Sequence, residues 1–339
     1  MGLRETSRKM KDVINRKASY KRGIYFLMIL AILVSTFILS LLVGRYSLNI
    51  QDLFFNDLGL AIVLNVRLPR ILFAVVLGGA LSISGAVMQS AFKNPLVGPE
   101  ILGVSQGAAF GAAFAILFLP KDPVTMEVLS MGFALLALLA SYAVSSAIKY
   151  GGRILRLVLA GLAVSAVFSG GVGILKCLAD PLKQLPELTF WLLGGLYGVT
   201  WRDIFYMAPL ALAGVIVLFI ARWRINLLTL EDDVIVSLGT DPGKLRAIVV
   251  TSAVIAASAV TSVAGVIGWV GLTVPHMARK IFGAESSIVI PASALLGAVL
   301  MVIFDDISRT ISEGEIPLGI VTSILGAAIF LMMLSRKGD

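Results

Sequence analysis

The sequence predicts an all-α polytopic membrane protein with about ten transmembrane helices, one of them shortened. Hydrophobic residues make up 58% of the 339 residues and charged residues only 14%, whereas a soluble domain averages about 25% charged residues. Between Arg70 and Lys93, 22 consecutive residues carry no formal charge, and about 20 apolar residues are enough to span a bilayer core. This run is rich in Gly, Ala and Ser, which let helices approach closely in lipid. We therefore expect it to be buried among other helices.

The remaining spans are expected wherever apolar runs stand between charged or Pro/Gly-containing turns. Residues 1–22 predict a basic cytoplasmic tail, and the apolar run behind them lacks a convincing cleavage site, so we expect a retained helix. The membrane domain covers 23–335, and 336–339 form a second cytoplasmic tail. Loop 180–203 holds a short interfacial helix that ends at glycines. The expected spans are 23–43, 71–92, 101–119, 127–148, 157–177, 204–221, 246–264, 269–281, 288–304 and 316–335, with a polar loop at 45–65.

One uncharged run is too long for a single span and too short for two full ones. It comprises the 29 residues 247–275 and has basic residues beyond both ends. Basic residues favour the cytoplasmic side, so both ends are expected there and the chain must cross twice. The economical solution is a full helix at 246–264 and a shortened one at 269–281, joined around Gly265 and Gly268. A break at membrane depth requires shelter by protein or by a cavity.

Charge predicts the orientation of the chain. Of the 28 Lys and Arg residues, 20 fall on the side that holds both termini, which places both termini in the cytoplasm and the protein in the plasma membrane. The net charge of +8 therefore reflects topology rather than binding to nucleic acid. A single Cys177 excludes a disulfide framework. A single His276 argues against an intrinsic metal site, and the sequence implies no cofactor.

The cytoplasmic segment 222–246 has its own pattern. Leu227, Leu230, Val234 and Leu238 recur at helical spacing and predict a short amphipathic helix outside the bilayer. Such a helix lies either on the lipid surface or in a protein groove. Three adjacent acidic residues disfavour the anionic inner leaflet, so docking onto another protein is the preferred interpretation.

The chain lacks a phosphate loop of its own. Gly243-Lys244 follows Gly239 at the wrong distance for a Walker sequence, and Leu245 stands where that sequence needs a hydroxyl residue. The sequence therefore predicts a protein that does not hydrolyse ATP, so any ATP-driven work would need another subunit.

Two stretches resemble a known family. Residues 67–111 contain RLPR, SGAVMQ, KNPLVGPEILG and SQGAAFG, and residues 265–280 read GVIGWVGLTVPHMARK. The sequence resembles the FecCD family, the permease subunits of ABC importers for iron–siderophores, haem and cobalamin, over roughly residues 60 to 335. The resemblance implies two copies of an ATP-binding subunit, a substrate-binding protein, a second permease subunit and surrounding membrane lipid as partners.

The resemblance also implies roles for individual residues. Those implied to contact the ATPase are Leu227, Leu230, Glu231, Asp232, Val234, Leu238, Gly239 and His276. Those implied to form the cytoplasmic gate are Asn94, Leu96, Ile154 and Leu155. Relatives usually have a Gly-Glu pair at Glu231-Asp232 and a small residue at Ile235. Cobalamin-type relatives carry hydroxyl residues at Ile154 and Leu155, so this chain mildly disfavours cobalamin.

Three outer arginines have two competing interpretations. In the family, residues at the positions of Arg67, Arg70 and Arg309 receive acidic residues of the binding protein, a role that suits the planar guanidinium fork. The alternative is anchoring at the interface or pairing within the chain. The acidic candidates for such pairing are Asp305, Asp306, Glu313 and Glu315.

Two further function classes compete with an importer subunit. An ion-coupled secondary transporter places ionisable residues inside its spans, and the expected spans lack an Asp or Arg in their middle. A structural scaffold explains neither the shortened span nor the amphipathic cytoplasmic segment. Haem or cobalamin remain alternatives to an iron–siderophore as cargo.

Overall fold

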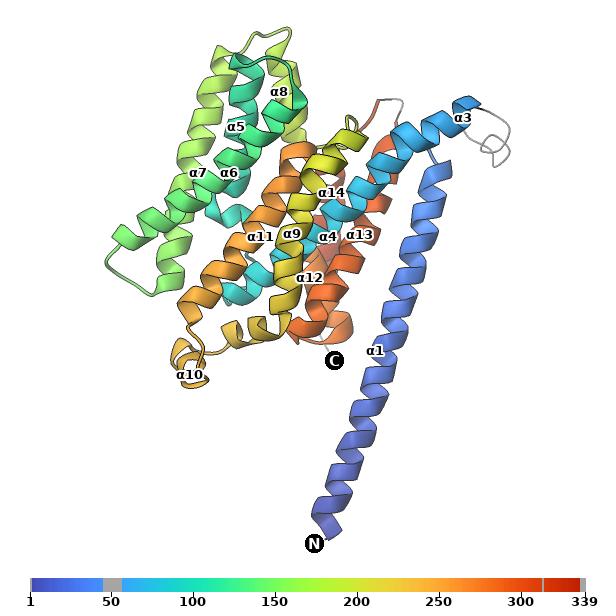
Figure 1. Cartoon of the computed structure of the whole chain (residues 1–339), viewed down its shortest axis with the longest axis vertical. Helices are drawn as coiled ribbons and strands as arrows, with labels where there is room; N and C mark the ends of the chain where they lie inside the picture. Colours follow the sequence, from blue (N-terminus) through green and yellow to red (C-terminus); the bar gives the residue numbers. More distant parts are fainter. Residues whose placement is uncertain (1, 45–56, 313, 336–339) are drawn as a thin grey trace.

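The structure is a computed structural model that describes residues 2–44, 57–312 and 314–335. These residues form an elongated bundle of helices without a strand (Figure 1). Within these described ranges, eight helices are long and apolar enough to cross a membrane. The main helices are α1 (Gly2–Leu42), α4 (Leu68–Ala91), α5 (Val104–Phe118), α6 (Pro123–Ala147), α7 (Arg153–Leu178), α9 (Trp201–Ile225), α11 (Pro242–Ala264), α12 (Val270–Phe282), α13 (Ser286–Thr310) and α14 (Leu318–Ser335).

Two of the ten expected spans correspond to helices that are too short for a full crossing. α5 has 15 residues and α12 has 13, both shorter than the roughly 20 that a full span needs. A short helix was expected for α12 but not for α5. The chain before α5 forms a 3-10 turn, Pro99–Leu102, and then a left-handed Gly103 with φ 78°, which delays the helix. The count of ten crossings stays a prediction.

The expected polar loop at 45–65 is wrong for its second half, whereas residues 45–56 lie outside the described part of the chain. α3 (Asp57–Ile62) and a π-helical turn (Val63–Arg67) lead without interruption into α4. The segment is largely apolar, so nothing in it stops the helix. Pro69 is tolerated because it lies in the first turn of α4.

The prediction that α4 is buried among other helices is confirmed. A Cβ added to Gly78 would lie 2.1 Å from the carbonyl oxygen of Gly297 on α13. One added to Gly85 would lie 1.8 Å from the carbonyl oxygen of Gly271 on α12. Glycine therefore allows backbone-to-backbone packing on two sides of α4, as expected for small residues at membrane helix interfaces.

The break between α11 and α12 falls where it was expected. α11 ends at Gly265, with φ 69°, and α12 begins at Val270. The predicted short helix is α8 (Gln184–Leu193), which ends at Gly194 with φ 70°. The amide of Gly195 donates a hydrogen bond to the carbonyl oxygen of Ala264 at 2.8 Å. The broken backbone is thus covered by protein, as membrane depth requires.

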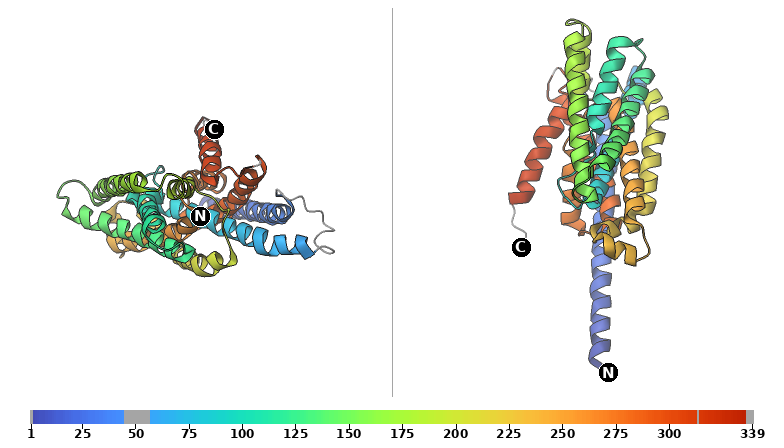
Figure 2. Two further views of the ribbon diagram at one scale, coloured as in Figure 1. Left: turned by 90° about the horizontal axis from the view of Figure 1, so that it is seen from above. Right: turned by 90° about the vertical axis from the view of Figure 1, so that its left-hand side faces the viewer.

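One end of the bundle gathers the segments predicted to be cytoplasmic. The start of α1, the end of α14 and α10 (Asp232–Ser237) lie toward the same end, and α14 stands to one side of the bundle (Figures 1 and 2). From Gly2 onward, the expected tail is helical and continuous with the first span. We refer to this end as the α10 end.

Candidate coupling and gating site

The coupling segment is less regular than its sequence pattern predicts. After α9, residues Asn226–Thr229 form a 3-10 turn, and Leu230 is extended with ψ 167°. α10 then has only six residues, Asp232–Ser237. Gly239, with φ 77°, turns the chain toward α11. The extended residue interrupts the expected stripe, so its four members do not share one helix.

The segment buries a different set of apolar side chains from the expected one. Leu228 and Ile235 are fully buried and hold the segment against the bundle. By contrast, Leu230 is 39% exposed, Val234 44% and Leu238 58%, while Leu227 is partly buried. An exposed apolar cluster with polar surroundings is typical of an interaction surface. We call Leu230, Val234 and Leu238 the α10 patch.

A buried arginine ties α10 to two long helices. Arg246 of α11 is only 3% exposed. Its Nη2 lies 3.0 Å from Oδ1 of Asp232 on α10, and its Nε donates to the carbonyl oxygen of Ala91 at the end of α4, also at 3.0 Å. The hydrogen bond from Arg246 lowers the pKa of Asp232 below its usual range, so the carboxylate is ionised at neutral pH.

The expected gate residues lie just beyond this tether. Lys93 adopts a left-handed conformation with φ 50°, and its ammonium lies 3.8 Å from Asp232. The Asn94 side chain then accepts a hydrogen bond from the amide of Leu96 at 2.9 Å, and Leu96 is 62% exposed. This turn, residues 93–96, is therefore linked to α10 by the Lys93–Asp232 contact as well as through Arg246, and we call it the gate turn.

The second half of the expected gate lies at the start of α7. Leu155 is 48% exposed, whereas Ile154 packs partly against the core. The 3-10 turn that follows the gate turn contacts α7 closely, because a Cβ on Gly161 would lie 2.2 Å from the carbonyl oxygen of Ile101. Within the described part of the chain, no hydrogen bond joins Ile154 or Leu155 to Asn94 or Leu96.

His276 lies on α12, where its ring packs against Phe330 of α14 with centroids 5.7 Å apart. No group of three or more His, Cys, Asp or Glu side chains that could hold a metal ion occurs among the described residues. Among the described residues, no hydrogen bond or ion pair joins His276 to the coupling segment.

The three outer arginines lie at the opposite end and are buried, with exposed fractions of 4% to 7%. Arg70 pairs with Asp305 at 2.8 Å and with Glu315 at 2.9 Å. Arg309 pairs with Asp306 and donates to the carbonyl oxygen of Ser40 at 2.7 Å.

Arg67 donates to the carbonyl oxygens of Leu41 and Leu42, at 2.6 and 2.8 Å. Pairing within the chain is thus the arrangement that the structure has for Arg70 and Arg309. Glu313, another expected partner, lies outside the described residues. Docking of a binding protein on these arginines stays a prediction.

Sequence reasoning missed the role of Arg246. Its sign in the sequence is an arginine next to the uncharged run of 29 residues, which a position at a helix end explains equally well. Sequence reasoning also ended the ninth span too early. Asp305 lies within α13, which runs to Thr310, and Glu127, at the edge of the expected fourth span, lies inside α6 with 2% exposure.

The chain is similar to known proteins over most of its length. The FecCD transport family model matches residues 31–336. A probable iron chelatin transport system permease protein of Helicobacter pylori is 39% identical over 293 residues, covering 85% of this chain and 88% of the relative. A molybdate import system permease protein of Haemophilus influenzae is 35% identical over 332 residues, covering 94% and 96%.

A solved structure, described as an inward-facing conformation of a metal-chelate type ABC transporter, superimposes with a TM-score of 0.87. The two sequences are 32% identical, and the match covers 93% of this chain and 100% of the solved chain. The family model thus matches most of the chain, and two relatives above 30% identity cover more than two thirds of it. This chain therefore belongs to the FecCD transport family of ABC importer permeases.

Proposed function

We propose that this chain is the transmembrane permease subunit of an ABC importer that takes up an iron–siderophore complex. A substrate-binding protein delivers the cargo at the end that holds the outer arginines, and two copies of a separate ATPase subunit supply the energy at the α10 end. The observation that carries the proposal is the α10 patch. Its three exposed apolar side chains stand on a segment that Leu228 and Ile235 anchor to the bundle.

The anchoring explains how ATPase movement could reach the transport path. A partner that pulls on the α10 patch also moves Asp232, which Arg246 joins to α11 and to Ala91 at the end of α4. The gate turn begins two residues later, and Lys93 in that turn faces the same carboxylate. Displacement of α10 is thereby passed to Asn94 and Leu96 through short polar contacts and the chain itself.

The second permease subunit has exposed apolar surface available to it. On α7, Val167 is 74% exposed and Ile174 64%, and on α14, Ile324 is 65% exposed. We propose that part of this surface faces a second permease, of the same or a paralogous sequence, and that lipid covers the rest. With the α10 end in the cytoplasm, both termini are cytoplasmic.

We propose that a binding protein docks at Arg67, Arg70 and Arg309 by competing with their existing acceptors. Because their guanidinium groups already contact acceptors within this chain, a binding protein must offer carboxylates that replace or extend those contacts. Arg suits such an exchange because it has several donors in a fixed fork.

The identity of the cargo is the most specific part of the proposal. Relatives named for an iron chelate and for molybdate are about equally similar to this chain, so iron–siderophore uptake is tested against molybdate, haem and cobalamin. The full importer, purified with its ATPase and reconstituted into vesicles with its binding protein, is given each labelled cargo. We expect ATP-dependent uptake of the ferric siderophore alone. Uptake driven by an ion gradient without ATP would identify a secondary transporter and refute the proposal.

A further inference from the structure

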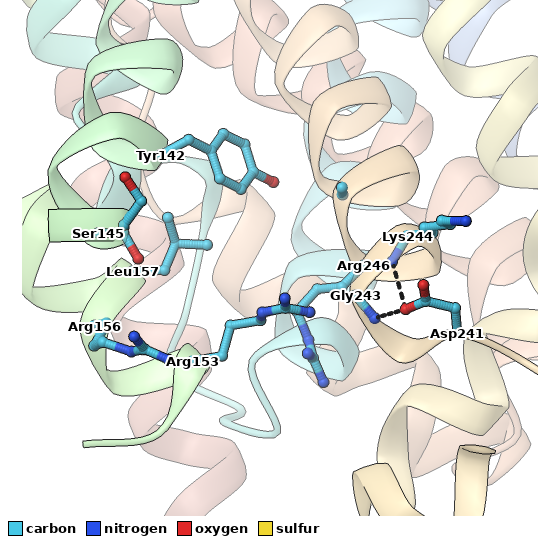
Figure 3. A pocket seen from close by; sticks show the side chains of 11 residues that line it. Tyr142, Ser145, Arg153, Arg156, Leu157, Asp241, Gly243, Lys244 and Arg246 are labelled. Carbon is cyan, nitrogen blue, oxygen red and sulfur yellow. Dashed lines mark hydrogen bonds between the residues drawn. The ribbon is translucent and has the colours of Figure 1, made fainter. Parts of the chain in front are cut away.

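A cavity of about 540 Å³ opens at the α10 end between α6, α7 and α11 (Figure 3). It lies where α6 ends and where both α7 and α11 begin, so its walls come from three helix ends. Cavities of roughly 300–1,000 Å³ hold small-molecule ligands in proteins. Its polar lining includes Tyr142, Ser145, Arg153, Arg156, Asp241 and Lys244.

The lining carries more positive charge than this chain neutralises. Arg246 also lines the cavity, but it is paired with Asp232. Asp241 is the acidic lining residue, and its carboxylate accepts hydrogen bonds from the amides of Gly243 and Lys244, at 2.8 and 3.1 Å. For Arg153, Arg156 and Lys244, the described residues offer no carboxylate within ion-pair distance.

The charged donors come from both walls of the cavity, and the Lys244 side chain points away from Arg153 (Figure 3). Arg153 extends from α7 across the cavity toward α11 (Figure 3), so closely that a Cβ on Gly243 would lie 1.9 Å from its Nη1. Arg156 donates from Nη1 to the carbonyl oxygen of Ile148 at 3.2 Å, while its buried Nε has no acceptor. The first turns of α7 and α11 add the positive ends of two helix dipoles. The cavity therefore presents donors and positive charge to a ligand rich in acceptors.

We propose that this cavity binds a phosphate group. Phosphate offers several acceptor oxygens that match the arginine fork, and basic pockets between membrane helices on the cytoplasmic side bind anionic headgroups. The phosphate belongs either to an anionic phospholipid or to a free ion. The inference stands apart from the cargo of the importer, because the site uses charges that neither the α10 patch nor the gate turn needs.

The test compares the full chain with a variant that lacks two of the cations, Arg153→Gln with Lys244→Gln. The matched control is Lys149→Gln, which removes an exposed cation from the corner between α6 and α7 without touching the cavity. Delipidated protein is titrated with phosphatidylglycerol in micelles and, separately, with inorganic phosphate. Bound lipid is counted by native mass spectrometry, and bound phosphate is followed by thermal stabilisation.

We expect one saturable site per chain in the parent and in Lys149→Gln, and at least tenfold weaker binding in the double variant. Higher ionic strength should weaken binding because salt screens charges that are open to solvent. Saturation by phosphatidylglycerol alone identifies the lipid as the source, and saturation by inorganic phosphate identifies the free ion. Equal binding by the parent and the double variant, or an equal loss in Lys149→Gln, would overturn the proposal.

A second variant guards against misfolding of the first. Gly243→Ala keeps every charge but places a Cβ where the Arg153 guanidinium lies. It should weaken binding in the same assays while the protein remains folded. Unchanged binding in a folded Gly243→Ala protein would likewise contradict the proposed site.

Discussion

Arg246 of α11 lies 3.0 Å from Asp232 of α10 and donates from another nitrogen to the carbonyl oxygen of Ala91 on α4. One buried side chain thus joins the coupling segment to two helices that are otherwise separate in sequence. α10 cannot shift far without breaking one of these contacts or moving both helices.

Asp232→Asn should weaken this connection. The change leaves the Arg246 charge without its carboxylate, and breaking a buried pair costs about 3–5 kcal/mol. Because Asp232 is itself 45% exposed, solvent screening reduces the expected loss of unfolding free energy to about 1–2 kcal/mol. Thermal unfolding in detergent measures it. Asp233→Asn, which removes a neighbouring exposed acid without a pair in the described structure, should unfold like the parent.

The same pair predicts a pH dependence. Arg246 lowers the pKa of Asp232 from its ordinary value of 3.8. A folded-state pKa below the unfolded value means that the stabilisation is fully present above the unfolded pKa and is lost as pH falls through the folded pKa. The stability difference between the parent and Asp232→Asn should therefore stay constant from about pH 8 to 5 and shrink below about pH 4. A difference that disappears near pH 6 would contradict the assignment.

The α10 patch should be required for ATPase binding. Leu230→Asp places a charge on the exposed patch, so the permease should still insert and fold while copurification of the ATPase and transport are lost. Thr229→Asp adds the same charge to the adjacent residue and should retain the ATPase. Ile235→Asp buries a charge in a site with no exposure, so it should destabilise the permease itself. Full ATPase recovery with Leu230→Asp would favour a lipid-facing role for the patch.

The pair of Arg70 and Asp305 should matter for stability. Asp305 is 1% exposed, so Arg70→Leu leaves a buried carboxylate without its main partner and should cost about 3–5 kcal/mol. The double variant with Asp305→Leu removes both charges and should recover most of that loss. Arg202→Leu removes a half-exposed cation and should cost about 0–1 kcal/mol. Unfolding in detergent, read as a double-mutant cycle, separates these outcomes.

Accessible cysteines should report the orientation. In a Cys177→Ser background, cysteines at Asp57 and Glu187 should react with an impermeant thiol reagent in intact cells. Cysteines at Lys149, Asp241 and Glu285 should react only after permeabilisation, because they lie at the α10 end. All five positions are exposed in the structure, so a missing reaction reflects the side of the membrane. Labelling of position 241 from outside would reverse the assignment.

Composition and spacing predicted the architecture well wherever one signal dominated. The buried α4 followed from its small residues, and the α11–α12 break followed from basic residues at both ends of one uncharged run. In both places the hydrophobic pattern and the glycine positions predict the same helix bounds. Tertiary contacts therefore had no conflicting local preference to override.

The finer details depended on contacts that spacing does not encode. Leu230 continues a helical stripe in the sequence, yet the chain extends there because Leu228 and Ile235 are the residues that the bundle accepts. Arg70 and Asp305 lie far apart in the sequence, so their pairing could be named only as one of several alternatives. The Arg246 tether likewise joins three helices, and no local pattern marks it.

The shelter around the α11–α12 break has a consequence for biogenesis. The amide of Gly319, at the start of α14, faces the carbonyl oxygen of Gly194 at 3.4 Å, and a Cβ on Gly319 would lie 2.2 Å from the carbonyl oxygen of Leu193. Because α14 follows α8, α11 and α12 in the sequence, it leaves the ribosome after them and closes the cover over backbone that was inserted earlier. Until α14 arrives, unpaired peptide groups near Val266 stand open at membrane depth. A chain released before residue 318 should thus be a target for membrane proteases even though its other long helices are already inserted.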